Sequence, residues 1–327
     1  MTTKTPAAAA AQHPDPATEA SASGTAALVA HLPDAATPAA EPPSYADLLA
    51  ENQQLKQQLE QARQHSEHAL RKYRNSQELR PYQAELIRMQ QCLESDGRKA
   101  IIVFEGRGAS GKGGTIRRIT QYMNAKRYKV VAFGKPREEQ RTQWFYQKYI
   151  QEFPHAGEIL LFDRSWYSRA LIEPVFSYCS DEEYANFLAG VKGFEKDLRR
   201  QGIILIKLYF SVSKEEQARR YAQRRIDPLQ SWKLEEADLD AEEFREAFTQ
   251  AKYRMLRHTH SHHSPWTIIR SDDKHKARLN AIKVILSQVD YAPLDPELSL
   301  TPDASCVVSG ARELERMEAY RIRNHIR

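Results

Sequence analysis

The residues best suited to chemistry begin in one glycine-rich segment, "IIVFEGRGASGKGGTI", at positions 101–116. Gly106, Gly111 and Lys112 have the spacing G-x-x-x-x-G-K, directly after an apolar run and before a helical pattern. In such a loop, successive backbone N–H groups and the helix N-terminus bind phosphate oxygens, and the lysine ammonium neutralises the terminal phosphates. The Ser or Thr that usually follows the lysine is absent: Gly113 stands there, and the first hydroxyl comes at Thr115. The segment predicts a phosphate-binding loop of unusual composition.

A second segment, "ILLFDRSWYSRA", carries the groups that would complete a phosphate site. Its apolar run ends at Asp163, and Arg164 and Arg169 follow. Parallel strands end at the same edge of a sheet, so a carboxylate here would lie beside the glycine-rich loop and could hold a metal ion. Guanidinium groups at the same edge can bind phosphate in two-point geometry. We expect the two segments to form one site.

The elements that position these residues alternate between strand and helix patterns. Short β-rich runs occur at 100–104, 129–133, 158–162, 203–210 and 266–270, separated by charged helical stretches. Near-continuous apolarity indicates strands that are buried on both faces, as in a parallel sheet covered by helices. The pattern predicts a three-layer α/β domain over residues 98–291, built on a central, mostly parallel sheet of five strands.

The segments on either side of the predicted α/β domain lack its strand–helix alternation. Residues 1–43 are rich in Ala and Pro and are predicted to be disordered. Residues 44–97 are predicted to be a helical extension, with a second helix beginning at Pro81. Its start has coiled-coil spacing, which indicates either oligomerisation or packing on the chain's own domain; that spacing involves Leu48, Asn52, Leu55, Leu59 and Ala62. Residues 292–327 are expected to form a loop and a basic helix.

Composition restricts the class of partner. The formal net charge is +5. Because the first 43 residues hold one basic and four acidic residues, the net charge of residues 44–327 is about +8. This surplus favours a polyanionic ligand or simply gives solubility. We expect neither nucleic acid, because no aromatic-plus-basic module accompanies the charge, nor a membrane, because no apolar run approaches about 20 residues. Three widely spaced cysteines fit a reducing compartment, so the predicted location is cytoplasmic.

Over nearly the whole α/β region the sequence resembles the polyphosphate kinase 2 family. The resemblance is carried by "FEGRGASGKGGTI", "QWFYQKYI", "GEILLFDRSWYSRA", "DPLQSWKL" and "PWTIIRSDDKHKARLNAI", and the wording is closest to the single-domain subgroup that acts on nucleoside diphosphates. It implies a P-loop kinase-like fold with a helical lid, a homo-oligomer (dimer or tetramer), and transfer of phosphoryl groups between inorganic polyphosphate and ADP or GDP. It also implies Mg²⁺, or Mn²⁺, as the cofactor.

The resemblance assigns roles to residues. Lys112, Asp163, Arg164 and Arg169 would be catalytic, with Asp163 as the metal ligand. Family members carry an aspartate where this chain has Gly108. The implied phosphate- and nucleotide-binding set consists of Gly106, Arg107, Gly108, Ala109, Ser110, Gly111, Lys112, Gly113, Gly114, Thr115, Lys135 and the lid residues Arg224 and Arg225. A basic track for polyphosphate is expected among Lys135, Arg137, Arg141, Lys148, Lys274, Lys276 and Arg278.

Two alternatives remain open from the sequence. The first is a protein of the same fold that binds polyphosphate or nucleotide with impaired catalysis, because glycine at position 108 supplies no carboxylate. The second is an ATP-dependent nucleoside-monophosphate kinase.

Overall fold

The computed structural model describes residues 44–234 and 243–325, so the Ala/Pro-rich tail and its predicted disorder lie outside the described residues. The chain divides into two units, Met1–Arg63 and Gln64–Arg327. The described part of the first unit is the start of helix α1 (Tyr45–Ser95). There, Leu48, Leu55 and Leu59 are exposed in the single chain.

Helix α1 is one element of 51 residues, and Pro81 lies inside it. The prediction of a separate helix that begins at Pro81 was therefore wrong. Proline removes one backbone donor and normally interrupts a helix. Here the buried face on both sides of it, with Leu79 before and Leu86, Met89 and Leu93 after, packs into the core and holds the helix through that position.

Within the described residues, six strands form one sheet in the order β2-β3-β1-β4-β5-β6. Pairing is parallel except between β5 and β6. The five predicted strands are confirmed, but the predicted strand number was too low, because the short antiparallel β6 arises from the C-terminal segment that was expected to be loop. The strands are β1 (Lys99–Gly106), β2 (Tyr128–Val131), β3 (Ile159–Asp163), β4 (Ile203–Ser211), β5 (Trp266–Arg270) and β6 (Val307–Ser309).

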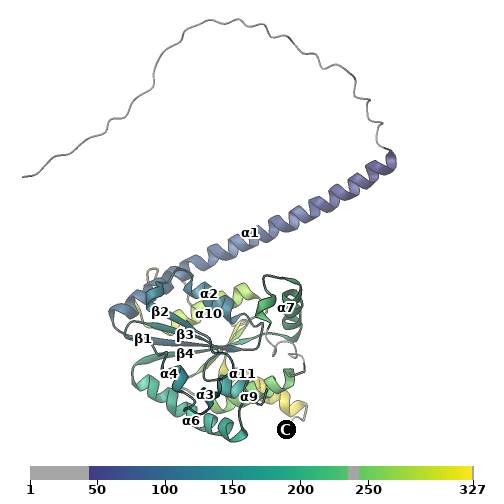
Figure 1. The fold of residues 1–327 in the computed structure, drawn as a ribbon. Helices are drawn as coiled ribbons and strands as arrows, with labels where there is room; N and C mark the ends of the chain where they lie inside the picture. Colours follow the sequence, from purple (N-terminus) through teal and green to yellow (C-terminus); the bar gives the residue numbers. More distant parts are fainter. Residues whose placement is uncertain (1–43, 235–242, 326–327) are drawn as a thin grey trace, which may run out of the picture. The chain divides into compact units, whose positions relative to one another are not determined.

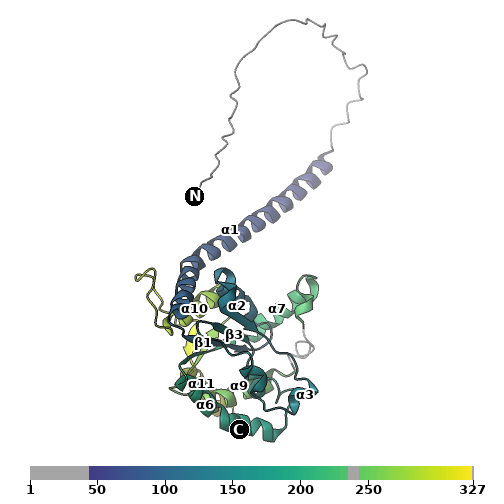
Figure 2. The ribbon, with the colours of Figure 1, turned by 60° about the vertical axis from the view of Figure 1, so that its left-hand side comes forward.

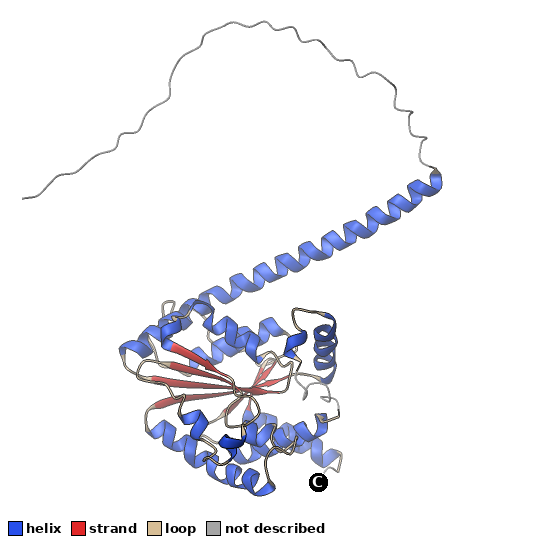
Figure 3. Cartoon of the chain, viewed as in Figure 1, coloured by secondary structure: helices blue, strands red, loops and turns tan. Residues whose placement is uncertain are grey.

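Helices cover both faces of the sheet and make the three-layer α/β architecture (Figures 1 to 3). One core cluster joins the end of α1 with α2 (Lys112–Ile119) and α10 (Lys274–Ser287). The other joins α6 (Asp181–Arg200) and α9 (Arg245–Thr259) with the opposite face. Among the described residues, no helix is both long and apolar enough to span a membrane. The remaining helices are α3 (Glu138–Arg141), α4 (Gln147–Ile150), α5 (Ser168–Leu171), α7 (Lys214–Ile226) and α11 (Gly310–Arg323).

The carboxyl ends of β1 and β3 lie next to each other in the sheet, with Phe104 of β1 in register with Asp163. At the end of β1 the backbone of Gly106 has φ = 137°. A Cβ atom there would lie 2.3 Å from the carbonyl oxygen of Phe210 on β4, so only glycine allows the chain to leave the sheet at this point. The phosphate loop therefore starts at the carboxyl end of β1, an inner strand of the sheet.

Candidate phosphate-binding site

The glycine-rich loop runs from the end of β1 into the first turn of α2, as its sequence predicts. The buried Lys112 folds back over it: Nζ donates to the carbonyl oxygens of Gly106 at 2.9 Å and Arg107 at 3.3 Å. The Thr115 hydroxyl donates to the carbonyl oxygen of Gly111 at 3.1 Å. Ala109, inside the loop, has φ = 58°. The lysine ammonium and the start of α2 are thus brought together, as in an anion-binding loop.

Asp163 lies against the start of α2. Its Oδ2 atom is 3.1 Å from the position that a Cβ atom would take on Gly113. A side chain at position 113 would have to displace this carboxylate or be displaced by it. Glycine in place of the usual Ser or Thr therefore lets the carboxylate approach the helix backbone closely, and the structure brings the two predicted segments together.

Glu105 holds the two segments together, a role that sequence reasoning did not assign. Its Oε1 accepts hydrogen bonds from the backbone N–H of Ser165 at 2.7 Å and from the Ser165 hydroxyl at 2.9 Å. The side chain is buried, and among the described residues Oε2 has no hydrogen-bond partner. Burial raises the pKa of Glu105 to about 7, against the opposing effects of the Ser165 bonds and the charge of Lys112. The carboxyl group fixes the loop after β3 to the end of β1.

The two arginines after Asp163 have different environments. Arg164 has φ = 69°, and its N–H donates to the Phe104 carbonyl oxygen at 3.0 Å, which continues the β1–β3 pairing. Arg169 forms ion pairs with Glu173 at 2.5 Å and Glu183 at 3.1 Å. Because both carboxylates bind the same guanidinium, Arg169 can bind a phosphate only through its remaining N–H donors or after one of these ion pairs breaks.

Arg169 also lines a cavity of about 430 Å³, here called the Arg169 pocket. Lys148 lines it too, and burial lowers the pKa of that lysine. Lys135 lies near its rim, with Nζ 4.6 Å from the ring centroid of the lining residue Tyr178. The other lining residues are Pro136, Gln140, Arg141, Phe145, Ser177, Cys179, Ser180 and Glu183. Cations and aromatic rings around one space suit a phosphorylated ligand.

The basic helix α7 contributes a residue that sequence reasoning did not single out. Arg220 is buried and donates to the carbonyl oxygens of Ala109 at 2.8 Å, Ser271 at 2.6 Å and Asp272 at 2.8 Å. It also binds Glu216 at 2.7 Å. Arg220 thereby fixes α7 to the phosphate loop.

The predicted lid residues lie in the last turn of α7. The guanidinium of Arg224 is 5.8 Å from the Tyr221 ring centroid, and Arg225 is exposed. Closure over phosphates stays a prediction for both.

Gly108 is held by a chain of side chains from α7 and α9. Its carbonyl oxygen accepts from Gln217 Nε2 at 3.1 Å, and Gln217 Oε1 accepts from Arg245 at 2.7 Å. Arg107 donates to the Arg245 carbonyl oxygen at 3.2 Å and to Thr249 at 2.6 Å. The loop is thus fixed from both sides without a carboxylate at position 108.

The basic track predicted for polyphosphate is not one continuous group of residues. Lys148 and Arg141 line the Arg169 pocket, whereas Arg278 lies beside the start of α2, 3.2 Å from a Cβ position on Gly114. Lys276 forms an ion pair with Asp303 at 2.6 Å.

Comparison with known proteins identifies the family. The sequence profile of "Polyphosphate kinase 2 (PPK2)" matches residues 69–296. The chain belongs to the polyphosphate kinase 2 family. Among its relatives in that family is the GDP-polyphosphate phosphotransferase of Pseudomonas aeruginosa, 42% identical over 236 residues, which are 72% of this chain and 66% of the relative. The ADP-polyphosphate phosphotransferase of the same organism is 46% identical over 222 residues, which are 68% of this chain and 73% of the relative.

A solved structure in the family supports the fold. The crystal structure of polyphosphate kinase 2 from Arthrobacter aurescens TC1 matches with a TM-score of 0.63 and 24% identity, covering 68% of this chain and 81% of that one. At this identity the similarity concerns the fold alone, and it confirms the predicted kinase-like α/β architecture.

The donor set around Asp163 fits a divalent cation of the Mg²⁺ type. Among the described residues, no cluster of three or more His, Cys, Asp or Glu could enclose a metal ion. Mg²⁺ does not need one, since it commonly binds one or two carboxylates together with waters and substrate phosphates. Asp163, beside the start of α2, is the residue that would hold such an ion.

Proposed function

We propose that this chain transfers phosphoryl groups between inorganic polyphosphate and nucleoside diphosphates. In one direction ADP gives ATP and GDP gives GTP, and in the other the nucleoside triphosphate donates to polyphosphate. The observation that carries the proposal is the placement of the Asp163 carboxylate against Gly113 in the first turn of α2, the helix that begins at the loop lysine Lys112. The names of the relatives, GDP- and ADP-polyphosphate phosphotransferase, support the same substrates. They favour this function over a binding-only protein and over a nucleoside-monophosphate kinase.

In the proposed reaction the protein positions phosphates and stabilises charge. The backbone N–H groups of the loop and Lys112 bind the phosphates between which the bond is exchanged, and Asp163 holds Mg²⁺, which when bound neutralises developing charge on the transferred group. Arg164 and Arg169 orient the equatorial oxygens, and Arg224 and Arg225 close over the site and exclude water. The Arg169 pocket, with Lys135 at its rim, receives a phosphorylated substrate.

The proposal extends to the organisation of the chain. We assign catalysis to residues 98–291 and oligomerisation to the helical extension at 44–97, where an exposed Leu48, Leu55 and Leu59 repeat could pair with a second copy. Cytoplasmic location is part of the same proposal, since three widely spaced free cysteines fit a reducing compartment.

The experiment that tests the function compares substrate pairs with the purified chain and Mg²⁺. Formation of ATP from ADP and polyphosphate is expected, with GTP formed from GDP in the same way. ADP formation from ATP and a nucleoside monophosphate, without any turnover of polyphosphate, would replace the proposal by the monophosphate kinase. Tight binding of polyphosphate without turnover of any pair would replace it by the binding-only protein.

A further inference from the structure

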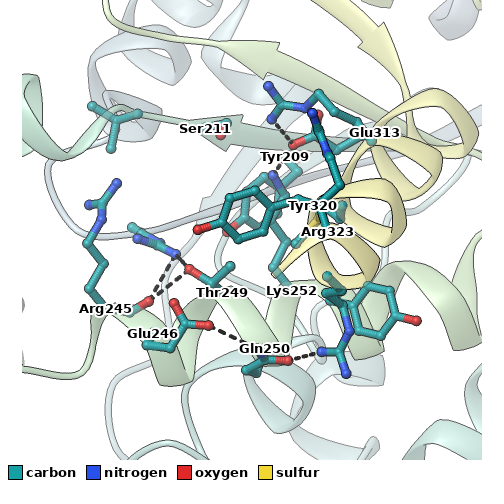
Figure 4. A pocket seen from close by; sticks show the side chains of 16 residues that line it. Tyr209, Ser211, Arg245, Glu246, Thr249, Gln250, Lys252, Glu313, Tyr320 and Arg323 are labelled. Atoms are coloured by element: carbon teal, nitrogen blue, oxygen red, sulfur yellow. Dashed lines mark hydrogen bonds and ion pairs between the residues drawn. The ribbon is translucent and has the colours of Figure 1, made fainter. Parts of the chain in front are cut away.

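A second cavity, of about 390 Å³, lies between α9 and the C-terminal helix α11; we call it the α9–α11 pocket. Its floor includes Tyr209 and Ser211 at the end of β4, and Arg107 of the phosphate loop belongs to its lining. Figure 4 shows the Tyr320 ring projecting from α11 into the space toward α9, with Arg245 across from it. The pocket therefore adjoins the phosphate loop but is distinct from the Arg169 pocket.

The lining of the α9–α11 pocket is strongly cationic. It contains six arginines and lysines against two glutamates, Glu246 and Glu313. Glu313 is buried and already pairs with Lys252 at 2.5 Å and with Arg316 at 3.1 Å. The acidic charge is thus largely neutralised within the wall, and the space is left with a surplus of positive charge that favours a polyanion.

Two of these cations, Arg107 and Arg245, lie at the phosphate-loop end of the pocket. Arg107 and Arg245 lie close enough for an N–H of Arg107 to reach the Arg245 carbonyl oxygen at 3.2 Å, and their like charges disfavour each other. Burial, followed by the charge of Arg107, lowers the pKa of Arg245. Among the described residues, no carboxylate lies within ion-pair distance of either guanidinium, so an anion would relieve a repulsion that the fold leaves in place.

The outer wall is α11, which lies beyond the residues 69–296 that match the family. The buried Lys252–Glu313 ion pair fixes this helix to α9. Arg321 hydrogen-bonds to Gln250 of α9, and Arg323 in the same final turn is exposed. Tyr320 keeps 56% of its surface exposed at the mouth of the pocket.

We infer that the α9–α11 pocket binds a distal segment of the inorganic polyphosphate chain, with Arg107 and Arg245 at the end next to the phosphate loop and Arg323 of α11 at the outer end. This inference rests on the proposed function, which supplies polyphosphate as the substrate. The chemistry recognised is a row of phosphate groups, each carrying about one negative charge, held by guanidinium groups spaced along the wall. A nucleotide offers fewer charges, and the cationic lining suits the longer chain better.

The test measures binding by titration calorimetry with the full-length protein, using long-chain polyphosphate, tripolyphosphate and ADP as probes. Arg323→Glu is expected to weaken long-chain binding by about three- to tenfold and to flatten its salt dependence. Tripolyphosphate and ADP, which carry far fewer negative charges than the long chain, should lose much less affinity. Arg245→Gln, at the inner end, should also weaken long-chain binding.

The matched control is Arg312→Glu, which reverses an exposed charge on the same helix outside the pocket. Equal long-chain affinity of Arg323→Glu and Arg312→Glu would overturn the inference. A loss of ADP binding with unchanged long-chain binding would also overturn it, since the pocket would then belong to the nucleotide. Because binding is read without turnover, absence of ATP formation would count against the proposed function and leave this comparison valid.

Discussion

The Asp163 carboxylate oxygen Oδ2 lies 3.1 Å from the position that a Cβ atom would take on Gly113, the residue that follows the loop lysine. The usual hydroxyl residue after that lysine would crowd this carboxylate. The absence of Ser or Thr is therefore the counterpart of a carboxylate that approaches α2 from the neighbouring strand. It gives a direct physical reason for a loop that looks incomplete in the sequence.

Substitution of Gly113 should disturb this contact. We expect Gly113→Ala to lower kcat by about tenfold or more, because the added methyl group displaces Asp163 from its place beside the loop. Steady-state ATP formation measures the effect. The control is Gly193→Ala on α6, where an added Cβ meets no atom within 4 Å. An unchanged kcat in Gly113→Ala would show that the close approach has no functional role.

Arg220 should matter much more than its neighbour Arg219. Arg220→Ala removes four hydrogen bonds of a buried guanidinium and is expected to cost about 2–4 kcal/mol in the free energy of unfolding. Arg219 binds the same Glu216 but is 60% exposed, so Arg219→Ala should stay within about 0.5 kcal/mol. Urea unfolding compares the two. Similar losses in both variants would contradict the role of Arg220 in fixing α7 to the loop.

Glu105 should make stability depend on pH. Its pKa is raised from 4.5 to about 7 in the folded chain, so the folded state binds the proton more tightly than the unfolded state. The stability this gives is complete below pH 4.5 and is lost as the pH rises to about 7. Glu105→Gln keeps an acceptor for Ser165 and should remove that loss, which amounts to about 3 kcal/mol at most. Urea unfolding at several pH values between 4.5 and 7.5 measures the free energy of unfolding of both proteins. The same change of that free energy with pH in both would refute the prediction.

Gly108 should limit the rate without abolishing it. A carboxylate at this position could help to position the metal ion, so Gly108→Asp is expected to raise kcat by as much as about 10³-fold over a measurable starting activity. Single-turnover ATP formation gives the chemical rate. Complete inactivity of the unchanged chain, together with clear activity of Gly108→Asp, would show that the natural protein is not an enzyme.

The sequence predicts those features that follow from local pattern. Apolar runs located five strands to within two residues at each end, and the end of one run placed Asp163 at the carboxyl edge of the sheet. The expectation of burial on both faces was wrong for β2, the edge strand, where Val130 is exposed. The three-residue β6 was not predicted, because so short a run has no periodicity of its own. Pro81 misled the helix prediction because burial of Leu79 and Leu86 outweighs the missing donor.

Tertiary partners were beyond the reach of pattern. Arg219 and Arg220 are adjacent and identical in type, and nothing local indicates that only the second reaches the phosphate loop. The same holds for Glu105, whose partner Ser165 is 60 positions away. The α9–α11 pocket is lined by residues of the phosphate loop, α9 and the C-terminal helix, which are far apart in the sequence. It can therefore be recognised only in the folded chain.

In the proposed function, Asp163 and the phosphate loop form one phosphotransfer site. The decisive measurement is ATP formation from ADP and long-chain polyphosphate with Mg²⁺, in the unchanged chain and in the isosteric variant Asp163→Asn, with the melting temperatures of both compared as a control for folding. We expect activity in the unchanged chain that is lost on chelation of Mg²⁺, and a fall of about 10³-fold in Asp163→Asn. Full activity in Asp163→Asn, or no ATP formation by the unchanged chain, would contradict it.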